Sequence, residues 1–154
     1  MTESRPLVPS DLALTVVGRR ARTLTAADLS TCAVTTYGEP FHCSSGREIA
    51  GRWVGVAVAD LLDEADPAPN TTHLRLESRD GYRVCVPIRA ALAGVLAFSR
   101  DDEPLDRPDG HGSRFVAPSV EGPRAVRDVA RMEAVVLAPD EDPTDLETIG
   151  ETDG

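Results

Sequence analysis

THLRLESRDGYRVCVP, residues 72–87, is the stretch that decides the fold. Apolar and polar side chains alternate along both halves of it, which is the pattern of a strand with one buried face. Arg79-Asp80-Gly81 separates the halves, and an Asp-Gly pair between two alternating runs is among the stronger short-range signals for a β-hairpin. We therefore expect two antiparallel strands at residues 73–78 and 82–87.

Short strand-like and helix-like segments continue on both sides of this hairpin. Residues 23–31 predict a short helical turn, with Thr25 as its N-cap and Asp28 in the capping-box position. Further strands are expected at residues 12–17, 33–37, 53–57, 95–99, 114–118 and 129–137, and further helical turns at residues 58–65 and 88–94. Because these elements follow no βαβ rhythm, the sequence predicts a mixed, β-rich α+β fold and not a doubly wound sheet.

Length and charge distribution predict one domain followed by an acidic tail. The 154 residues are 41% hydrophobic, enough for one core. Seven of the 26 acidic residues lie in residues 139–154, a stretch without any basic residue, which predicts a solvated, disordered extension. The expected organisation is a short N-terminal tail at residues 1–11, a domain at residues 12–138 and an acidic disordered tail at residues 139–154.

Charge and cysteine content argue against several classes of protein. A net charge of −10 disfavours nucleic acid and anionic membranes as partners. No stretch approaches the roughly 20 apolar residues that span a bilayer, and the N-terminal residues do not resemble a secretion signal, so we expect a cytoplasmic protein. Cys32, Cys43 and Cys85 form no CxxC pair, which favours free thiols over a disulfide framework or a structural zinc site.

His42-Cys43 is the first candidate for chemistry. It lies in a loop rich in Gly and Ser, near Arg47, where a thiolate could be stabilised. A thiolate is a soft ligand suited to a transition metal or to the metal of a cofactor. Considered alone, an ordinary half-buried thiol is the commoner explanation for such a residue.

The second candidate is the segment Gly110–Met132, which is locally positive within an acidic chain. It contains four arginines, at positions 114, 124, 127 and 131, against Glu121 and Asp128. Arginine is suited to bidentate contact with phosphate, and Gly122 lets the backbone approach a ligand closely. The alternative is a solvated strand edge with surface ion pairs.

Taken in order, these segments resemble the sulfite oxidase-type molybdopterin-binding oxidoreductase domain family. The resemblance covers about residues 12–137, and no single motif is decisive. Besides the hairpin, it rests on TLTAADL (23–29), FHCSSG (41–46), RWVGVAVADLL (52–62), LAFSRDDEPL (96–105), HGSRFVAP (111–118) and GPRAVRDVARMEAV (122–135).

The resemblance implies a molybdenum cofactor and a set of site residues. Cys43 falls on the cysteine that ligates molybdenum, next to His42. Arg114, Arg124 and Arg127 fall on positions that bind the pterin phosphate or line the anion pocket, with His111 beside them in the family's His-Gly. The family's active-site tyrosine falls on Phe98, which lacks its hydroxyl. The implied activity is oxygen-atom transfer, or reduction of a small oxidised sulfur or nitrogen compound, with electrons passing to a separate electron-transfer protein.

Two hypotheses follow, and a third is weaker. The first is a compact molybdopterin-dependent oxidoreductase, favoured by the retention of Cys43 together with the Arg124/Arg127 pair. The second is a non-catalytic relative acting as a binding or partner-regulating module. It is favoured by Phe98, by Asp101-Asp102 in place of Asn-Gly, and by the short stretch before the first strand. The third is a zinc site formed by His42, Cys43 and His111.

Overall fold

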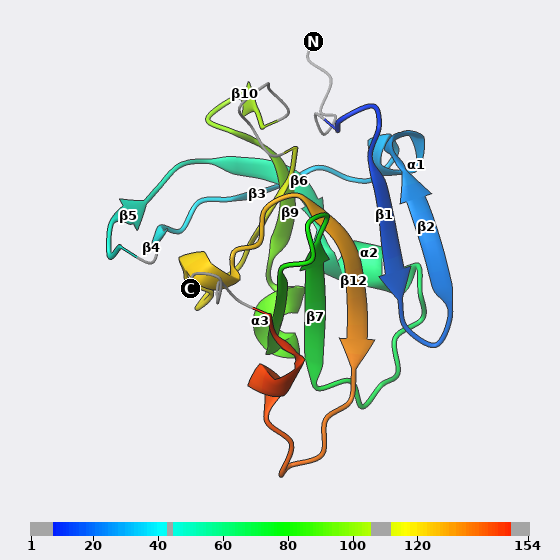
Figure 1. Ribbon diagram of the computed structural model, residues 1–154. Helices are drawn as coiled ribbons and strands as arrows, with labels where there is room; N and C mark the ends of the chain where they lie inside the picture. The colour runs from blue at the N-terminus through cyan, green and yellow to red at the C-terminus, as the bar shows by residue number, and fades with distance from the viewer. Residues whose placement is uncertain (1–7, 43–44, 106–111, 149–154) are drawn as a thin grey trace.

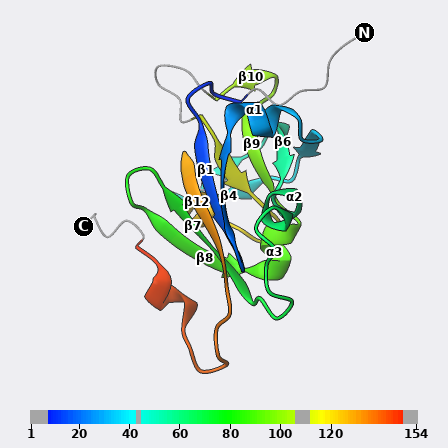
Figure 2. The ribbon, with the colours of Figure 1, turned by 90° about the vertical axis from the view of Figure 1, so that its right-hand side faces the viewer.

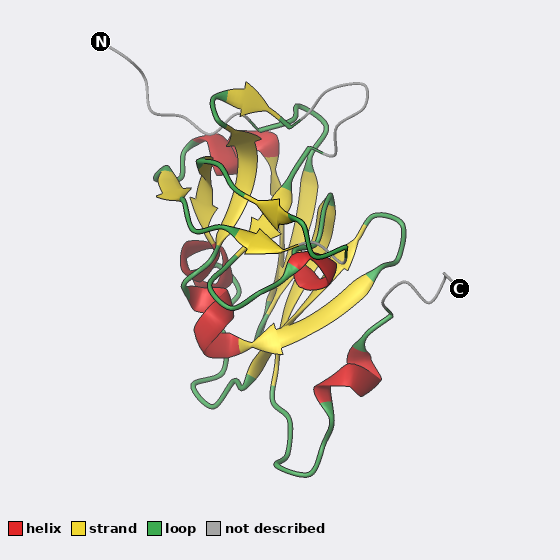
Figure 3. Ribbon diagram, turned by 90° about the vertical axis from the view of Figure 1, so that its left-hand side faces the viewer, coloured by secondary structure: helices red, strands yellow, loops and turns green. Residues whose placement is uncertain are grey.

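The computed structural model describes residues 8–42, 45–105 and 112–148. Strands predominate over helices in this part of the chain (Figure 3), and the helices are short. None of the described helices has both the length and the apolar character needed to cross a bilayer. The arrangement is the β-rich α+β fold that the sequence predicts.

The first sheet, sheet A, contains the hairpin from which the sequence argument started. Its order is β2-β1-β12-β7-β8, and every neighbouring pair is antiparallel except β1 with β12. The strands are β1 (Ala13–Val17), β2 (Ala21–Thr25), β7 (His73–Ser78), β8 (Arg83–Pro87) and β12 (Val129–Val135). Alternation decides which face is buried: Leu74 and Leu76 of β7 are fully buried, whereas Arg75 and Glu77 face outwards.

The second sheet, sheet B, is built around β9 (Val95–Arg100). One edge of β9 pairs with β6 (Trp53–Ala57), which in turn pairs with β3 (Thr35–Tyr37). The other edge pairs with β11 (Arg114–Val116) and with β10 (Glu103–Pro104). Gly55 permits the close approach of β6 to β9, since a Cβ there would lie 1.9 Å from the Leu96 carbonyl oxygen.

The core lies between the two sheets. Figure 2 shows β1, β12, β7 and β8 on one side of the molecule and β6, β9, α2 (Val58–Asp63) and α3 (Ile88–Leu92) on the other. All side chains of β9 over residues 95–99 are buried, so neither face of this strand is open to solvent there. A two-stranded hairpin, β4 (Phe41–His42) with β5 (Glu48–Ile49), extends away from this core (Figure 1).

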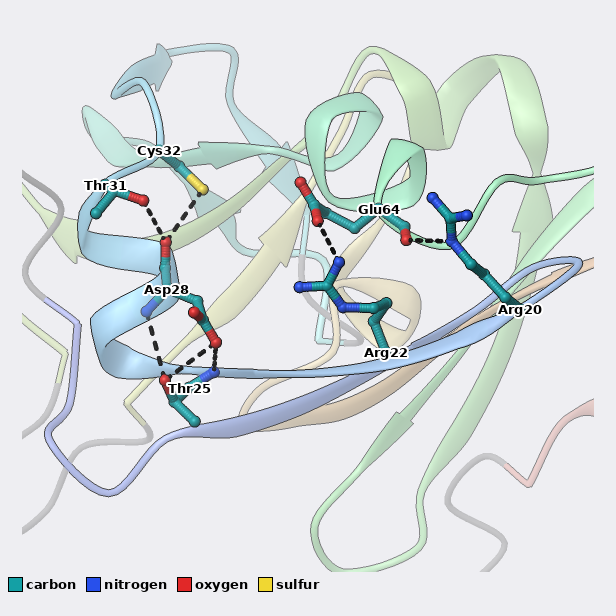
Figure 4. A network of polar contacts seen from close by, with 7 residues as sticks. All are labelled: Arg20, Arg22, Thr25, Asp28, Thr31, Cys32 and Glu64. Atoms are coloured by element: carbon teal, nitrogen blue, oxygen red, sulfur yellow. Dashed lines mark hydrogen bonds and ion pairs between the residues drawn. The ribbon is translucent and has the colours of Figure 1, made fainter.

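The N-terminal helix, α1, begins directly after Thr25, as its capping residues predict. The residues before it form a strand that the sequence did not predict. Strand β2 runs to Thr25, and α1 covers Ala26–Ser30. The Asp28 carboxylate accepts from the Thr25 backbone N–H at 2.9 Å, and the Thr25 hydroxyl accepts from the Asp28 N–H at 3.4 Å (Figure 4). The Thr25 backbone N–H and then the Thr25 hydroxyl, which both donate to the carboxylate, lower the pKa of Asp28. The predicted helical turn at 23–31 is therefore shorter, because residues 21–25 pair with β1.

The same view shows how β2 is tied to the end of α2. The Arg22 guanidinium lies 3.0 Å from the Glu64 carboxylate, and the Arg20 side chain donates to the Glu64 carbonyl at 3.3 Å (Figure 4). These groups are about half exposed, so their contribution to stability is small, on the order of 0–1 kcal/mol. They fix the edge of sheet A that lies away from β8.

The C-terminal segment, residues 142–148, lies against β8 and is not a free extension. After β12 the chain turns back (Figure 1), forms the 3-10 turn η2 (Pro143–Leu146) and reaches β8. Thr148 exchanges two backbone hydrogen bonds with Arg83, at 3.0 and 3.1 Å. This contact covers the open edge of sheet A, where unpaired N–H groups would otherwise face solvent. Residues 149–154 lie outside the described residues, and the expected acidic tail at residues 139–154 stays a prediction.

Candidate functional site

A pocket of about 390 Å³ opens between the turn of the β7–β8 hairpin and the segment that joins β11 to β12. This volume lies within the range usual for small-molecule sites. The hairpin contributes Ser78, Asp80 and Tyr82, and β11 contributes Arg114. The joining segment contributes Gly122, Pro123, Ala125, Val126, Arg127 and Asp128. Two arginines and two aspartates thus face one space.

Arg114 is the most constrained of the charged residues in the pocket. It is only 8% exposed, and its Nε donates to the Ala125 carbonyl at 2.9 Å. Its guanidinium lies over the ring of Phe41 at 5.1 Å and over the ring of Trp53 at 5.9 Å. Contact with two aromatic faces stabilises a cation where few waters reach it. Arg114 therefore presents a fixed positive charge to the pocket.

The aromatic support beneath Arg114 belongs to sheet B and the β4–β5 hairpin. The rings of Phe41 and Trp53 are 6.0 Å apart and tilted by 35°. Arg100 lies over the same Trp53 ring at 5.2 Å, so two guanidinium groups contact one indole. The Trp53 Nε1 is buried and has no acceptor among the described residues. Trp53 itself is not among the residues that line the pocket, and its ring supports Arg114 from beneath.

Tyr82 closes the pocket from the hairpin side. Its hydroxyl donates to the Pro123 carbonyl, which joins the hairpin to the 3-10 turn η1 (Gly122–Arg124). Burial raises the pKa of Tyr82, and the nearby Arg124 opposes that shift. The phenol is therefore protonated over the ordinary pH range and remains a donor.

Arg127 and Asp128 form the far wall of the pocket. Arg127 forms an isolated bridge with Arg114, which places these two predicted residues side by side in the backbone. Asp128 has a φ of 58°, and its N–H donates to the Ser113 carbonyl at 2.8 Å. Its carboxylate lies 3.7 Å from Arg79, so the pocket carries charges of both signs.

The structure places Arg124 differently from the other two predicted arginines. It is not among the residues that line the pocket. Its Nε and Nη2 instead donate to the two oxygens of Glu147, at 2.7 and 2.6 Å. This bidentate pair raises the pKa of Arg124. The sequence could not indicate the pair, because Glu147 lies in a stretch whose composition predicts disorder.

Phe98, on which the family's active-site tyrosine falls in the resemblance, lies in β9. It is fully buried within β9 and does not line the pocket. Its position on a strand covered on both faces explains this, because every side chain of Val95–Ser99 packs into the interior. Phe98 contributes to the core in this structure.

The residues around the predicted thiolate lie next to the pocket, although Cys43 itself lies outside the described residues. The His42 backbone N–H donates to the Glu121 carboxylate at 2.7 Å, and its ring Nδ1 lies 3.4 Å from the same oxygen. Glu121 directly precedes Gly122 of the pocket wall. His111 also lies outside the described residues, so the zinc hypothesis stays a prediction. The described part of the chain contains no cluster of three metal-binding side chains.

The fold and the sequence together identify the class. Residues 3–141 match the model of the oxidoreductase molybdopterin binding domain, and the chain belongs to that family. The resemblance to the sulfite oxidase type is thereby confirmed at the level of the family.

Two relatives illustrate the match. The mitochondrial sulfite oxidase of Drosophila melanogaster is 30% identical over 92 residues, which cover 53% of this chain and 16% of that protein. The crystal structure of the sulfane dehydrogenase SoxCD from Paracoccus pantotrophus superimposes with a TM-score of 0.75 at 23% identity. That alignment covers 90% of this chain and 41% of the other. The chain thus spans less than half the length of either protein.

Several residues of the site were not predicted from the sequence. Tyr82 stood in the quoted Asp-Gly-Tyr hairpin, and Trp53 in the quoted strand, but neither was assigned a role. Phe41 directly precedes the candidate pair His42-Cys43, and this position was the one signal that could have suggested a role for it. In the sequence, Glu121 and Glu147 were only counted among the acidic residues. Their contacts with His42 and Arg124 join positions far apart in the chain, so only the structure reveals them.

Proposed function

We propose that this chain is the cofactor-binding domain of a molybdopterin-dependent oxidoreductase, with Cys43 as the thiolate ligand of molybdenum. The observation that carries the proposal is the pocket in which Arg114 and Arg127 lie side by side, in a chain that belongs to this family. The pocket fits a phosphate-bearing cofactor, because it is lined by two guanidinium groups, which match phosphate geometry.

The residues of this chain would bind and orient the cofactor. Arg114, held on two aromatic rings, would bind the phosphate together with Arg127. The hairpin β4–β5 would bring Cys43 to the metal, since His42 is bonded to Glu121 at the edge of the pocket. When bound, the molybdenum centre supplies oxygen-atom transfer to or from a small substrate. Electrons would pass to a separate protein.

Elemental analysis tests this proposal. In protein purified from cells that make the cofactor, we expect about one molybdenum per chain and the fluorescence of the oxidised pterin. Cys43→Ala should lose the molybdenum. Cys32→Ala is the matched control, because Cys32 is a half-buried thiol just after α1 and lies outside the pocket lining. Wild-type protein without molybdenum or pterin would contradict the proposal.

The second candidate is a non-catalytic binding module of the same fold. Two observations favour it: Phe98 is enclosed in the core, and Arg124 is paired with Glu147. In that case the pocket would still bind an anion, and molybdenum would be absent from wild-type protein. The elemental analysis therefore separates the two candidates.

A further inference from the structure

The C-terminal segment supplies an acidic side chain to a family arginine from outside the family match. The match ends at residue 141, whereas Glu147 lies six residues later. Its side chain is 5% exposed, which is unusual for a carboxylate. The contact is therefore a feature of this chain beyond its family core.

The Glu147 carboxylate is bound as an anionic ligand would be. One oxygen accepts from Arg124 Nη2 at 2.6 Å. The other accepts from Arg124 Nε at 2.7 Å and from the Cys85 backbone N–H at 2.9 Å. A guanidinium fork binds a carboxylate and a phosphate with the same parallel geometry. Glu147 thus occupies the donors that a phosphate would use.

Arg124 adjoins the pocket although it is turned away from it. Pro123 and Ala125, its neighbours on either side, both line the pocket. The Arg124 side chain is 41% exposed, so solvent reaches it from one side. Arg124 therefore stands between two residues of the wall of the pocket that Arg114 and Arg127 line.

Polar contacts hold the C-terminal segment in place, with little apolar burial. The turn η2 contains no buried residue. Besides the Glu147 contacts, the described bonds to β8 are the two that Thr148 exchanges with Arg83. Segments with few buried apolar contacts open at low cost in free energy. The segment can therefore leave while the two sheets stay folded.

We propose that the C-terminal segment is a displaceable latch in which Glu147 competes with a phosphate-type anion for Arg124. Binding of the anion releases Glu147 from Arg124 and lifts residues 147–148 from the edge of β8. This inference rests on the proposed function only in taking the ligand of the pocket to carry a phosphate group.

Titration with inorganic phosphate, followed by amide NMR of the full chain, tests the latch. In wild-type protein, phosphate should perturb the amides of Arg83 and Cys85, which donate to Thr148 and Glu147. Glu147→Gln should bind phosphate about tenfold more tightly, because the charge-assisted bonds of the competitor are lost. Asp145→Asn is the control: it removes the same charge from the same segment, where Asp145 has no side-chain partner in the described structure. Its affinity should match that of wild type.

A double variant shows whether the gain passes through Arg124. Glu147→Gln combined with Arg124→Leu should return phosphate affinity to the wild-type value or below it. Equal or weaker binding by Glu147→Gln alone, with its amide spectrum still that of a folded protein, would overturn the latch and make the pair a fixed tether. The titration uses chain produced in cells that do not make the cofactor, so that no pterin phosphate occupies the pocket. Its result is therefore separate from the molybdenum content that tests the proposed function.

Discussion

Two walls of the pocket differ in how they hold an arginine of the same predicted role: the first wall is β11 with Arg114, and the second is the turn η1, whose Gly122 and Pro123 line the pocket while Arg124 does not. Arg114 stands on a strand of sheet B, is 8% exposed and lies over two aromatic rings. Arg124 stands in a single 3-10 turn, is 41% exposed and is paired with a carboxylate from the C-terminal segment. One charge is fixed by packing in the core, and the other by a polar contact. The residue type alone therefore does not tell whether an arginine is available to a ligand.

Trp53→Ala should have the largest effect, because it removes the support of the first wall. Trp53 is 2% exposed and contacts Phe41, Arg100 and Arg114. We expect a loss of about 3–5 kcal/mol in the free energy of unfolding, measured by urea denaturation. Leu92→Ala, at a side chain 44% exposed, is the control and should change stability far less. A loss below about 1 kcal/mol for Trp53→Ala would contradict the claim that the first wall is fixed by packing in the core and the second by a polar contact.

Glu147→Gln should have an intermediate effect on stability. The substitution keeps the shape of the side chain but weakens its bonds to Arg124 and Cys85, so we expect a loss of about 1–2 kcal/mol. Denaturation of Glu147→Gln beside Asp145→Asn measures it, and the control should stay close to wild type. A loss as large as that of Trp53→Ala would show that the second wall belongs to the cooperative core.

Tyr82→Phe should have a smaller effect, on the link between the hairpin and η1. The change leaves the Pro123 carbonyl without its donor from Tyr82 but keeps the packing of the ring. We expect a loss of about 1 kcal/mol, measured in the same way. The amide of Arg124 should also shift in NMR spectra, because η1 loses its tie to the hairpin. An unchanged stability and spectrum would mean that the hydroxyl does not hold the turn.

The sequence predicted the elements well wherever a local pattern decides them. The β7–β8 hairpin follows from alternation and from Asp80-Gly81, and α1 follows from Thr25 and Asp28. The strand β2 was missed because the turn joining it to β1, around Gly18-Arg19-Arg20, carries two arginines that give no clear turn signal. Short pairs such as β4–β5 lie below the length at which periodicity can be recognised.

The site was predictable in its residue types and less so in its partners. Arg114 and Arg127, two of the arginines that the resemblance singles out, line the pocket, and their role toward a phosphate stays a prediction. The pairing of Arg124 with Glu147 joins residues far apart in the chain, through a segment whose local composition favours disorder. Phe98 could not be placed by sequence, since both faces of β9 are buried and alternation gives no direction. Cys43 and His111 lie outside the described residues, so their roles stay predictions.

The smallest expected effect is on how the free energy of unfolding depends on pH. It comes from Cys85, whose backbone N–H donates to Glu147. Burial, and then the nearby Glu147, raise the pKa of the Cys85 thiol from 9.0 to about 11. Because the folded state disfavours the thiolate, the stability this thiol contributes is complete below pH 9 and is lost as the pH rises towards 11. Between those values wild-type protein should therefore lose more stability than Cys85→Ala, each compared with its own value at pH 8.

The quantity compared is the slope of the free energy of unfolding against pH, and comparing this slope between variants makes the measurement specific to Cys85. The titrations of Tyr37 and Tyr82, whose pKa values burial also raises, occur in both proteins and cancel, as does the constant cost of the smaller side chain. Glu147→Gln should show a slope between the two, since removing that charge withdraws one cause of the shift. Equal slopes in wild type and Cys85→Ala would mean that the thiol is hydrated, and hence that the C-terminal segment does not stay closed over β8 in solution.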